Sequence, residues 1–147
     1  MAIFMRYGRI KGRIELTSFQ WGVSRSIGTA TPGSTSRENS APKLGEINVT
    51  KRYDSSTPML FLDAVAGRLD NKVIIEFTGT TGGKVEIVVK YELENVGLSH
   101  FFQSSSGDEP TESLSLNFSK ITMTFTGLEP GSKEETVGYD LTQMKTV

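Results

Sequence analysis

Several residue types that support common chemistries are scarce in this 147-residue sequence. It has no cysteine, so disulfides, thiolate nucleophiles and cysteine-ligated metal centres are excluded. His100 is the only histidine. Neither sign of charge dominates, because 16 Lys and Arg face 17 Asp and Glu. Nucleic acids and anionic bilayers attract proteins through clustered Lys and Arg, so we expect no nucleic-acid partner.

Long apolar runs are missing as well. No stretch approaches the roughly 20 residues of a membrane span, so we expect no membrane insertion. The first residues, Met1 to Gly8, lack the apolar core and the small-residue cleavage site of a secretory signal. We therefore expect a protein that is made in the cytoplasm without a signal peptide, and that leaves the cell, if it does, by another route.

The remaining composition favours a β protein. With 36% hydrophobic and 22% charged residues, the chain is ordinary for a globular protein, and 15 glycines against 5 prolines suit many turns between short strands. Its length fits one hydrophobic core. We predict an all-β fold with a single domain over residues 1–147.

Two segments alternate between apolar and polar residues and then change parity. Lys84 to Glu94 alternates strictly, and after Asn95 the apolar residues change sides, which predicts a strand that bulges or passes from one sheet to another. In Leu114 to Thr126 the parity changes at Ser119-Lys120. This pair is a poor two-residue hairpin turn, so one long bulged strand is predicted there.

Shorter strands follow from partial alternation with a β-branched or aromatic bias. They are predicted at Ile3 to Tyr7, Arg13 to Ser24, Leu44 to Arg52, Val73 to Thr78 and Thr136 to Lys145. The glycine-rich step from Gly79 to Lys84 is predicted to be a hairpin connection.

Only one segment is predicted to be helical, from about Pro58 to Ala66. Thr57 suits the N-cap, Pro58 the first helical position and Gly67 the left-handed position after the end. The residues between them are apolar almost all round, with Asp63 the exception. Such a helix is predicted to be packed rather than solvated.

The longest irregular stretch is Arg25 to Pro42, which is rich in Ser, Thr, Gly, Pro and Asn. A loop of this length inside a compact domain is usually functional or disordered. A shorter irregular stretch covers Gln103 to Pro110. The sequence therefore predicts one long extended loop.

Candidate catalytic groups find little support. His100 has no Gly-x-Ser-x-Gly elbow and no second imidazole beside it, so a surface or interface role is favoured. Gly79 to Lys84 lacks the first glycine and the final hydroxyl residue of a phosphate-binding loop, since Thr78 and Val85 stand there. We expect no catalytic residue, no cofactor and no metal, and a protein that is not an enzyme.

The remaining polar and aromatic candidates have simple structural explanations. The pairs Asp108-Glu109 and Glu134-Glu135 fall in polar loops, where solvated charge is the default. Trp21 beside Phe19 is expected to pack in the core, because no basic groove accompanies it for base stacking.

Whole segments resemble the haemolysin-coregulated protein (Hcp) family of type VI secretion systems. Ile14 to Ser24 (IELTSFQWGVS) is similar to the family's opening strand, and Val49 to Leu60 (VTKRYDSSTPML) to its strand-to-helix passage. Glu112 to Ile121 (ESLSLNFSKI) resembles the most specific family strand, and Gly138 to Leu141 (GYDL) the closing strand. These segments occur in the family's order and cover nearly the whole chain.

One departure from the family pattern is visible near the start. Ile10-Lys11-Gly12 runs directly into Arg13, where the family commonly has a polar excursion that contains acidic residues and histidine. We therefore carry over none of the ring-face contacts of that excursion to this chain.

The resemblance implies a two-sheet β-barrel with one flanking helix. It also implies a tube protein: six copies form a ring, and rings stack into a conduit that carries small effectors, is capped by a VgrG-like spike protein, and is assembled on baseplate proteins. A contractile sheath would expel the tube, which is how the protein would be secreted.

Site residues are assigned from this expected architecture. Arg25 to Lys43 is predicted to be the ring-stacking loop, with Arg25, Arg37, Glu38 and Lys43 as its charges. Ser18 and Gln20 lie opposite Phe19 and Trp21 by alternation and are predicted to face the lumen.

Two alternatives share much of this pattern. A tube protein of a contractile phage tail or related injection particle would have the same architecture. A monomeric ligand-binding β-barrel would instead bind an apolar molecule inside one subunit.

Overall fold

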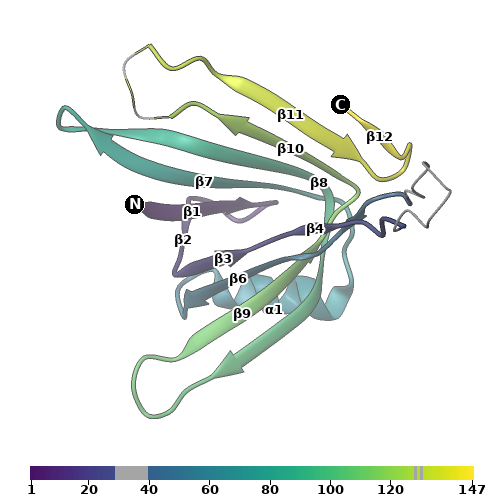
Figure 1. Cartoon of the computed structure of the whole chain (residues 1–147). Helices are drawn as coiled ribbons and strands as arrows, with labels where there is room; N and C mark the ends of the chain where they lie inside the picture. Colours follow the sequence, from purple (N-terminus) through teal and green to yellow (C-terminus); the bar gives the residue numbers. More distant parts are fainter. Residues whose placement is uncertain (29–39, 128, 130) are drawn as a thin grey trace, which may run out of the picture.

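Two antiparallel sheets and one helix make up the molecule, which is a computed structural model that describes residues 1–28, 40–127, 129 and 131–147 (Figure 1). Sheet A has the order β12 (Lys145–Thr146), β11 (Glu135–Asp140), β10 (Lys120–Phe125), β8 (Lys84–Ser104), β7 (Asn71–Thr81), β1 (Ala2–Tyr7) and β2 (Ile14–Leu16). Sheet B has the order β3 (Ser18–Gln20), β6 (Ile47–Arg52), β9 (Thr111–Asn117) and the second half of β8. The mostly β fold with two sheets and one short helix confirms the predicted class.

Strand β8 belongs to both sheets, as the parity change after Asn95 predicts. In sheet A it pairs with β10 up to Glu94 and with β7 up to Val96, and from Gly97 it pairs with β9 in sheet B. Asn95 has a φ of 54°, a left-handed conformation that turns the strand. The predicted passage between sheets is confirmed.

The segment from Leu114 to Thr126 makes the same passage, but as two strands. The prediction of one bulged strand is wrong in this respect, because β9 ends at Asn117 and β10 begins at Lys120. The two do not form a hairpin, since each pairs with a different half of β8. Ser119 bonds to β8 at the point where both segments pass from one sheet to the other. Its N–H donates to the Glu94 carbonyl (3.0 Å) and its Oγ accepts from Asn95 Nδ2 (2.7 Å).

Other predicted strands are broken where the chain changes partners. Arg13 to Ser24 contains β2, β3 and β4 (Val23–Ser24), because β2 pairs in sheet A, β3 in sheet B, and β4 with β5 (Lys43–Leu44). The Thr17 N–H between β2 and β3 donates to the Thr50 carbonyl at 2.8 Å. The predicted hairpin at Gly79 to Lys84 is confirmed, with positive φ at Gly82 and Gly83.

Helix α1 (Thr57–Ala66) lies where the sequence predicts it, with Gly67 in the left-handed conformation after its end. Its N-cap is Ser56 rather than Thr57. The Thr57 hydroxyl is engaged elsewhere, since it donates to Glu112 Oε1 at 2.7 Å and accepts the Asp54 N–H at 3.0 Å. Among the described residues, no helix has the length and apolar content to cross a membrane.

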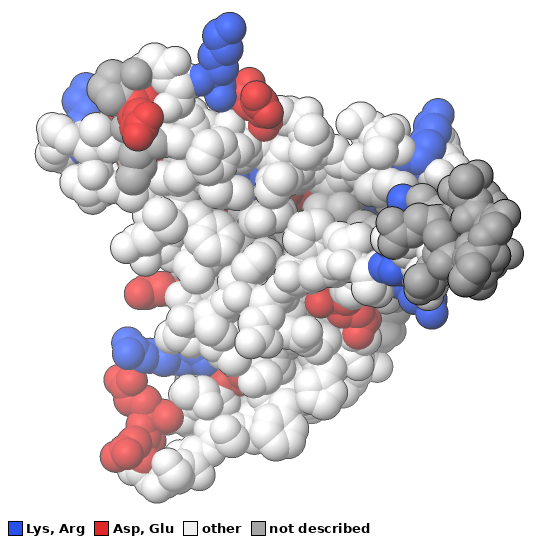
Figure 2. All heavy atoms as spheres, viewed as in Figure 1, with Lys and Arg blue, Asp and Glu red and all other residues white. Residues whose placement is uncertain are grey.

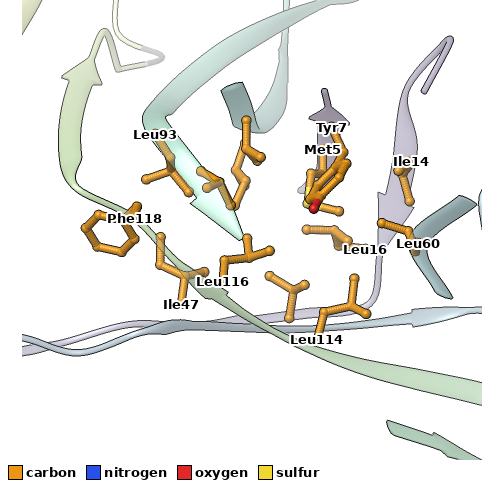
Figure 3. Packing of buried hydrophobic residues seen from close by; sticks show 14 of the residues in the cluster. Met5, Tyr7, Ile14, Leu16, Ile47, Leu60, Leu93, Leu114, Leu116 and Phe118 are labelled. Carbon is orange, nitrogen blue, oxygen red and sulfur yellow. The ribbon is translucent and has the colours of Figure 1, made fainter. Parts of the chain in front are cut away.

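The hydrophobic core lies between the two sheets (Figure 3). Its fully or almost fully buried members come from both sheets and the helix: Met5, Tyr7, Ile14, Leu16, Ile47, Val49, Leu60, Leu93, Leu114, Leu116 and Phe118 among them. The segment that follows helix α1 approaches β8 so closely that a Cβ on Gly97 would lie 2.8 Å from the Arg68 carbonyl oxygen. The helix is thereby fixed beside the sheet-B half of β8.

Candidate functional site

The outer face of sheet B carries the predicted lumen residues. Ser18 and Gln20 are exposed, whereas Phe19 and Trp21 turn toward the interior. The Phe19 ring lies 5.1 Å from those of Phe77 and Tyr91, and Trp21 lies 5.9 Å from Tyr91. Alternation thus places Ser18 and Gln20 correctly on the outer face, and their role in a channel wall stays a prediction.

Small polar side chains continue this face across the sheet. In register with Ser18 are Thr50 and Ser113, and in register with Gln20 are Asn48 and Ser115. Several of them bond to one another, as in Ser18 Oγ to Thr50 Oγ1 (2.5 Å) and Ser115 Oγ to Asn48 Oδ1 (2.6 Å). These six side chains are polar and uncharged, and the face becomes charged at Arg52, which follows on the same side of β6.

His100 lies on the same face, at the β8 side. It is in register with Ser115, and its ring stacks on Phe102 with centroids 6.0 Å apart. Both side chains are exposed, and 55% of the Phe102 surface is accessible to solvent. Among the described residues, no group of three or more acidic, histidine or cysteine side chains could hold a metal ion.

The predicted stacking loop is anchored by a short ladder. Strands β4 and β5 pair at its root, and the Ser40 N–H donates to the Ser26 carbonyl at 3.1 Å. Arg25 and Lys43 are both exposed there, and Figure 2 shows Lys and Arg side chains gathered at this end of the molecule. Arg37 and Glu38 lie outside the described residues.

The carboxylate pairs considered in the sequence lie on the surface. Asp108, Glu109, Glu134 and Glu135 are all exposed, and Glu109 pairs with Arg52 at 2.9 Å. None of the four pockets described for this part of the chain is lined by these carboxylates, whereas acid–base chemistry needs a desolvated arrangement.

A buried ion pair, which the sequence analysis missed, lies at the end of sheet B beside the helix. Lys51 and Glu112 are fully buried, with Lys51 Nζ 2.5 Å from Glu112 Oε1. Lys51 Nζ also lies 3.0 Å from Asp54 Oδ1 and donates to the Arg52 carbonyl at 2.9 Å. Burial alone would raise the pKa of Asp54, but hydrogen bonds from Ser56 and Lys51 outweigh it, so its pKa lies below the usual value.

A second polar cluster fixes the helix to sheet A and explains the lone acidic residue of α1. Asp63 Oδ2 accepts from the Tyr7 hydroxyl and from Asn71 Nδ2, both at 2.7 Å. Burial, and then the hydrogen bond to Asp63, raise the pKa of Tyr7 far above its ordinary value. Asp63 is thereby turned inward.

The rest of the helix surface is apolar and open. The prediction that α1 is packed on all sides is wrong for this chain alone, because only Leu60 is buried. Its apolar surface residues retain roughly half or more of their exposure: Met59 48%, Phe61 48%, Leu62 56% and Val65 66%. We call these four residues the helix stripe. The sequence predicts the helix but not which of its faces lacks a partner.

A matching apolar hollow lies on another part of the molecule. It has a volume of about 310 Å³ and opens between the root of the loop and strands β10 and β11. Its wall includes Trp21, Val23, Leu44, Met123, Val137 and Tyr139, and none of the described residues that line it is charged. We call it the loop-root hollow.

Comparisons with known proteins agree with this architecture. The family model for the type VI secretion system effector Hcp matches residues 7–125. No curated protein sequence matches the chain.

Solved structures share the fold at low sequence identity. One, a type six secretion system protein, is 18% identical with a TM-score of 0.83 over 99% of both chains. Hcp1 from Salmonella typhimurium is 18% identical with a TM-score of 0.72 over 99% of this chain and 98% of that one. A type VI secretion system effector from Yersinia pestis is 14% identical with a TM-score of 0.73 over 94% and 98%. Because the family model spans most of the sequence, this chain belongs to the Hcp family of type VI secretion system proteins.

Proposed function

We propose that the chain is a structural subunit of the type VI secretion inner tube, in which six copies form a ring and rings stack into a conduit. The observation that carries this proposal is sheet B, which has a polar outer face and two strand edges without a neighbour among the described residues. An open edge offers unpaired N–H and C=O groups that another chain can complete.

The two edges are suited to each other. Strands β3, β6, β9 and β8 alternate in direction across sheet B, so β3 at one edge and β8 at the other run opposite ways. A second copy placed side by side would therefore set its β3 antiparallel to β8 of the first. This contact joins two different surfaces, and a rotation that closes it produces a ring.

The polar face supports the role of a conduit wall. Copies joined in this way would turn the same face, with Ser18, Gln20 and Asn48, toward a shared interior. Around these residues such a wall presents hydroxyl and amide groups to passing cargo. Small effectors would travel inside it, and sheath contraction would expel the tube with its spike protein.

Ring stacking is assigned to the loop between β4 and β5. Its exposed root charges, Arg25 and Lys43, support contacts that fix the register of one ring on the next. Exposed charges are screened by salt, so stacking should weaken as ionic strength rises.

The mass of the purified protein in solution tests the proposal. Size-exclusion chromatography with light scattering should give the mass of six chains, and negative-stain images should show rings with a central hole. A mass of one chain at every concentration would contradict it.

A further inference from the structure

Two apolar surfaces have no partner among the described residues. The single charged residue of helix α1, Asp63, is turned inward to Tyr7 and Asn71. Arg9 and Arg68 lie beside Met59 and Leu62, so charge borders the helix stripe at this edge. Within the described part of the chain, the wall of the loop-root hollow includes no charged residue. The hollow also offers few polar groups for ordered water, which needs two to four partners, so an apolar occupant suits it.

The stripe and the hollow flank opposite edges of sheet B. Helix α1 packs beside the sheet-B half of β8: the Phe61 ring lies 6.1 Å from that of Phe101, and Arg68 and Leu69 cover Gly97. The hollow begins at Trp21, the residue that follows β3.

The two surfaces also lie at the same height along the strands. Gln20 is in register with Asn48, Asn48 with Ser115, and Ser115 with His100. Trp21, the residue after β3, is therefore level with Leu98. Leu98 is next to Gly97, which Arg68 and Leu69 cover just after the end of the helix. If β3 of one copy joins β8 of another, the second copy's helix arrives beside the first copy's hollow.

We propose that the helix stripe of each subunit docks into the loop-root hollow of its neighbour, so that the occupant of the hollow is a second copy of this chain. The contact rests on the proposed ring and specifies its outer layer: strand edges join around the interior while helix and hollow join behind them. Docking would cover the helix surface that the single chain leaves exposed.

Charge substitutions on either side of the contact test it. Val65→Glu on the helix and Val137→Glu in the hollow alter side chains that are 66% and 54% exposed, so each chain should still fold. Each should raise the concentration at which rings dissociate by about ten-fold or more, because an unpaired carboxylate would be buried at the contact. Val85→Glu, at a 69% exposed site outside both surfaces, is the matched control and should leave the rings unchanged.

Engineered cysteines locate the contact directly, since the natural chain has none. A Val65→Cys/Val137→Cys variant treated with a short bismaleimide should give a ladder of covalent oligomers. The length of the cross-linker allows for a shift of a few residues in the docking. Each single-cysteine variant should give dimers at most.

The outcomes separate this contact from the ring itself. Wild-type rings together with unaffected glutamate variants and no ladder would overturn the helix–hollow contact and leave the ring intact. A wild-type chain that is monomeric at all concentrations would overturn the ring. An apolar fluorescent dye that binds the hollow equally well in assembled rings would also overturn the proposal, because the hollow should then be filled.

Discussion

Lys51 keeps its ammonium group at zero exposure, although a charge removed from water costs several kcal/mol unless its partners replace the solvent. Here Glu112, Asp54 and the Arg52 carbonyl do so. Gln103 Nε2 and the Thr57 hydroxyl also donate to the Glu112 carboxylate. The pair thereby links the end of sheet B to the first turn of the helix.

Removing one partner of this pair should destabilise the chain strongly. Glu112→Ala leaves the Lys51 ammonium buried with a weaker set of partners, so we expect a loss of about 3 kcal/mol in the free energy of unfolding. Urea unfolding at one fixed protein concentration measures it. The double variant Lys51→Met/Glu112→Leu removes both charges and should lose much less, and an equal loss would show that packing rather than charge dominates.

The lowered pKa of Asp54 predicts a pH dependence with a definite sign. Because the folded pKa lies below the unfolded one, the ionised carboxylate stabilises the fold above the unfolded value of about 3.9, and this contribution is lost as pH falls through the folded pKa. Asp54→Asn should therefore be less stable than the wild type near pH 6, with the difference shrinking below about pH 4. A difference that stays constant with pH would contradict this.

Strand alternation could have predicted both buried charges. Lys51 has the parity of Ile47 and Val49, and Glu112 has that of Leu114 and Leu116, so each falls on the inward side of its strand. What the sequence could not give is their contact, since β6 and β9 meet only through tertiary register. Asp63 is similar: its position on an apolar helix marks it as unusual, but its partners Tyr7 and Asn71 are distant in sequence.

Among the larger elements, the helix was predictable in position and not in its surroundings. Pro58 and Gly67 mark its two ends, because start and stop signals are local, although the N-cap is Ser56 and not Thr57. Exposure of the helix stripe depends on how far the sheets extend beside the helix, and on partners outside the chain. The passage of β8 between sheets was predictable, because the alternation of apolar and polar residues changes parity within the sequence of this strand.

The loop between β4 and β5 can be shortened without disturbing its root. Replacing residues 27–39 by Asn-Gly keeps the β4–β5 ladder and the Ser26 to Ser40 hydrogen bond, and a type I′ turn suits the gap. We expect rings of unchanged mass and no stacked tubes in electron micrographs. Tubes as long as those of the wild type would show that other residues stack the rings.

At the scale of the whole molecule, the polar face of sheet B should tune cargo retention. Gln20→Arg adds a positive charge to each copy at an exposed position on that face, and repeated around a ring it should weaken retention of a co-expressed effector without changing ring mass. Pull-down of the effector with purified rings measures it. Gln143→Arg, in the exposed turn before β12, is the matched control and should retain cargo as the wild type does.

The crossing at Asn95 and Ser119 has a mechanical consequence. Strand β8 has 21 residues, roughly 70 Å of backbone if fully extended, and it runs without a break through both sheets. A push on sheet A is therefore transmitted to sheet B along covalent bonds, while the flanking hydrogen bonds are loaded in shear and share the force. Because covalent bonds join the two layers at this turn, the layers cannot slide past each other there without breaking the hydrogen bonds of Ser119 to Glu94 and Asn95.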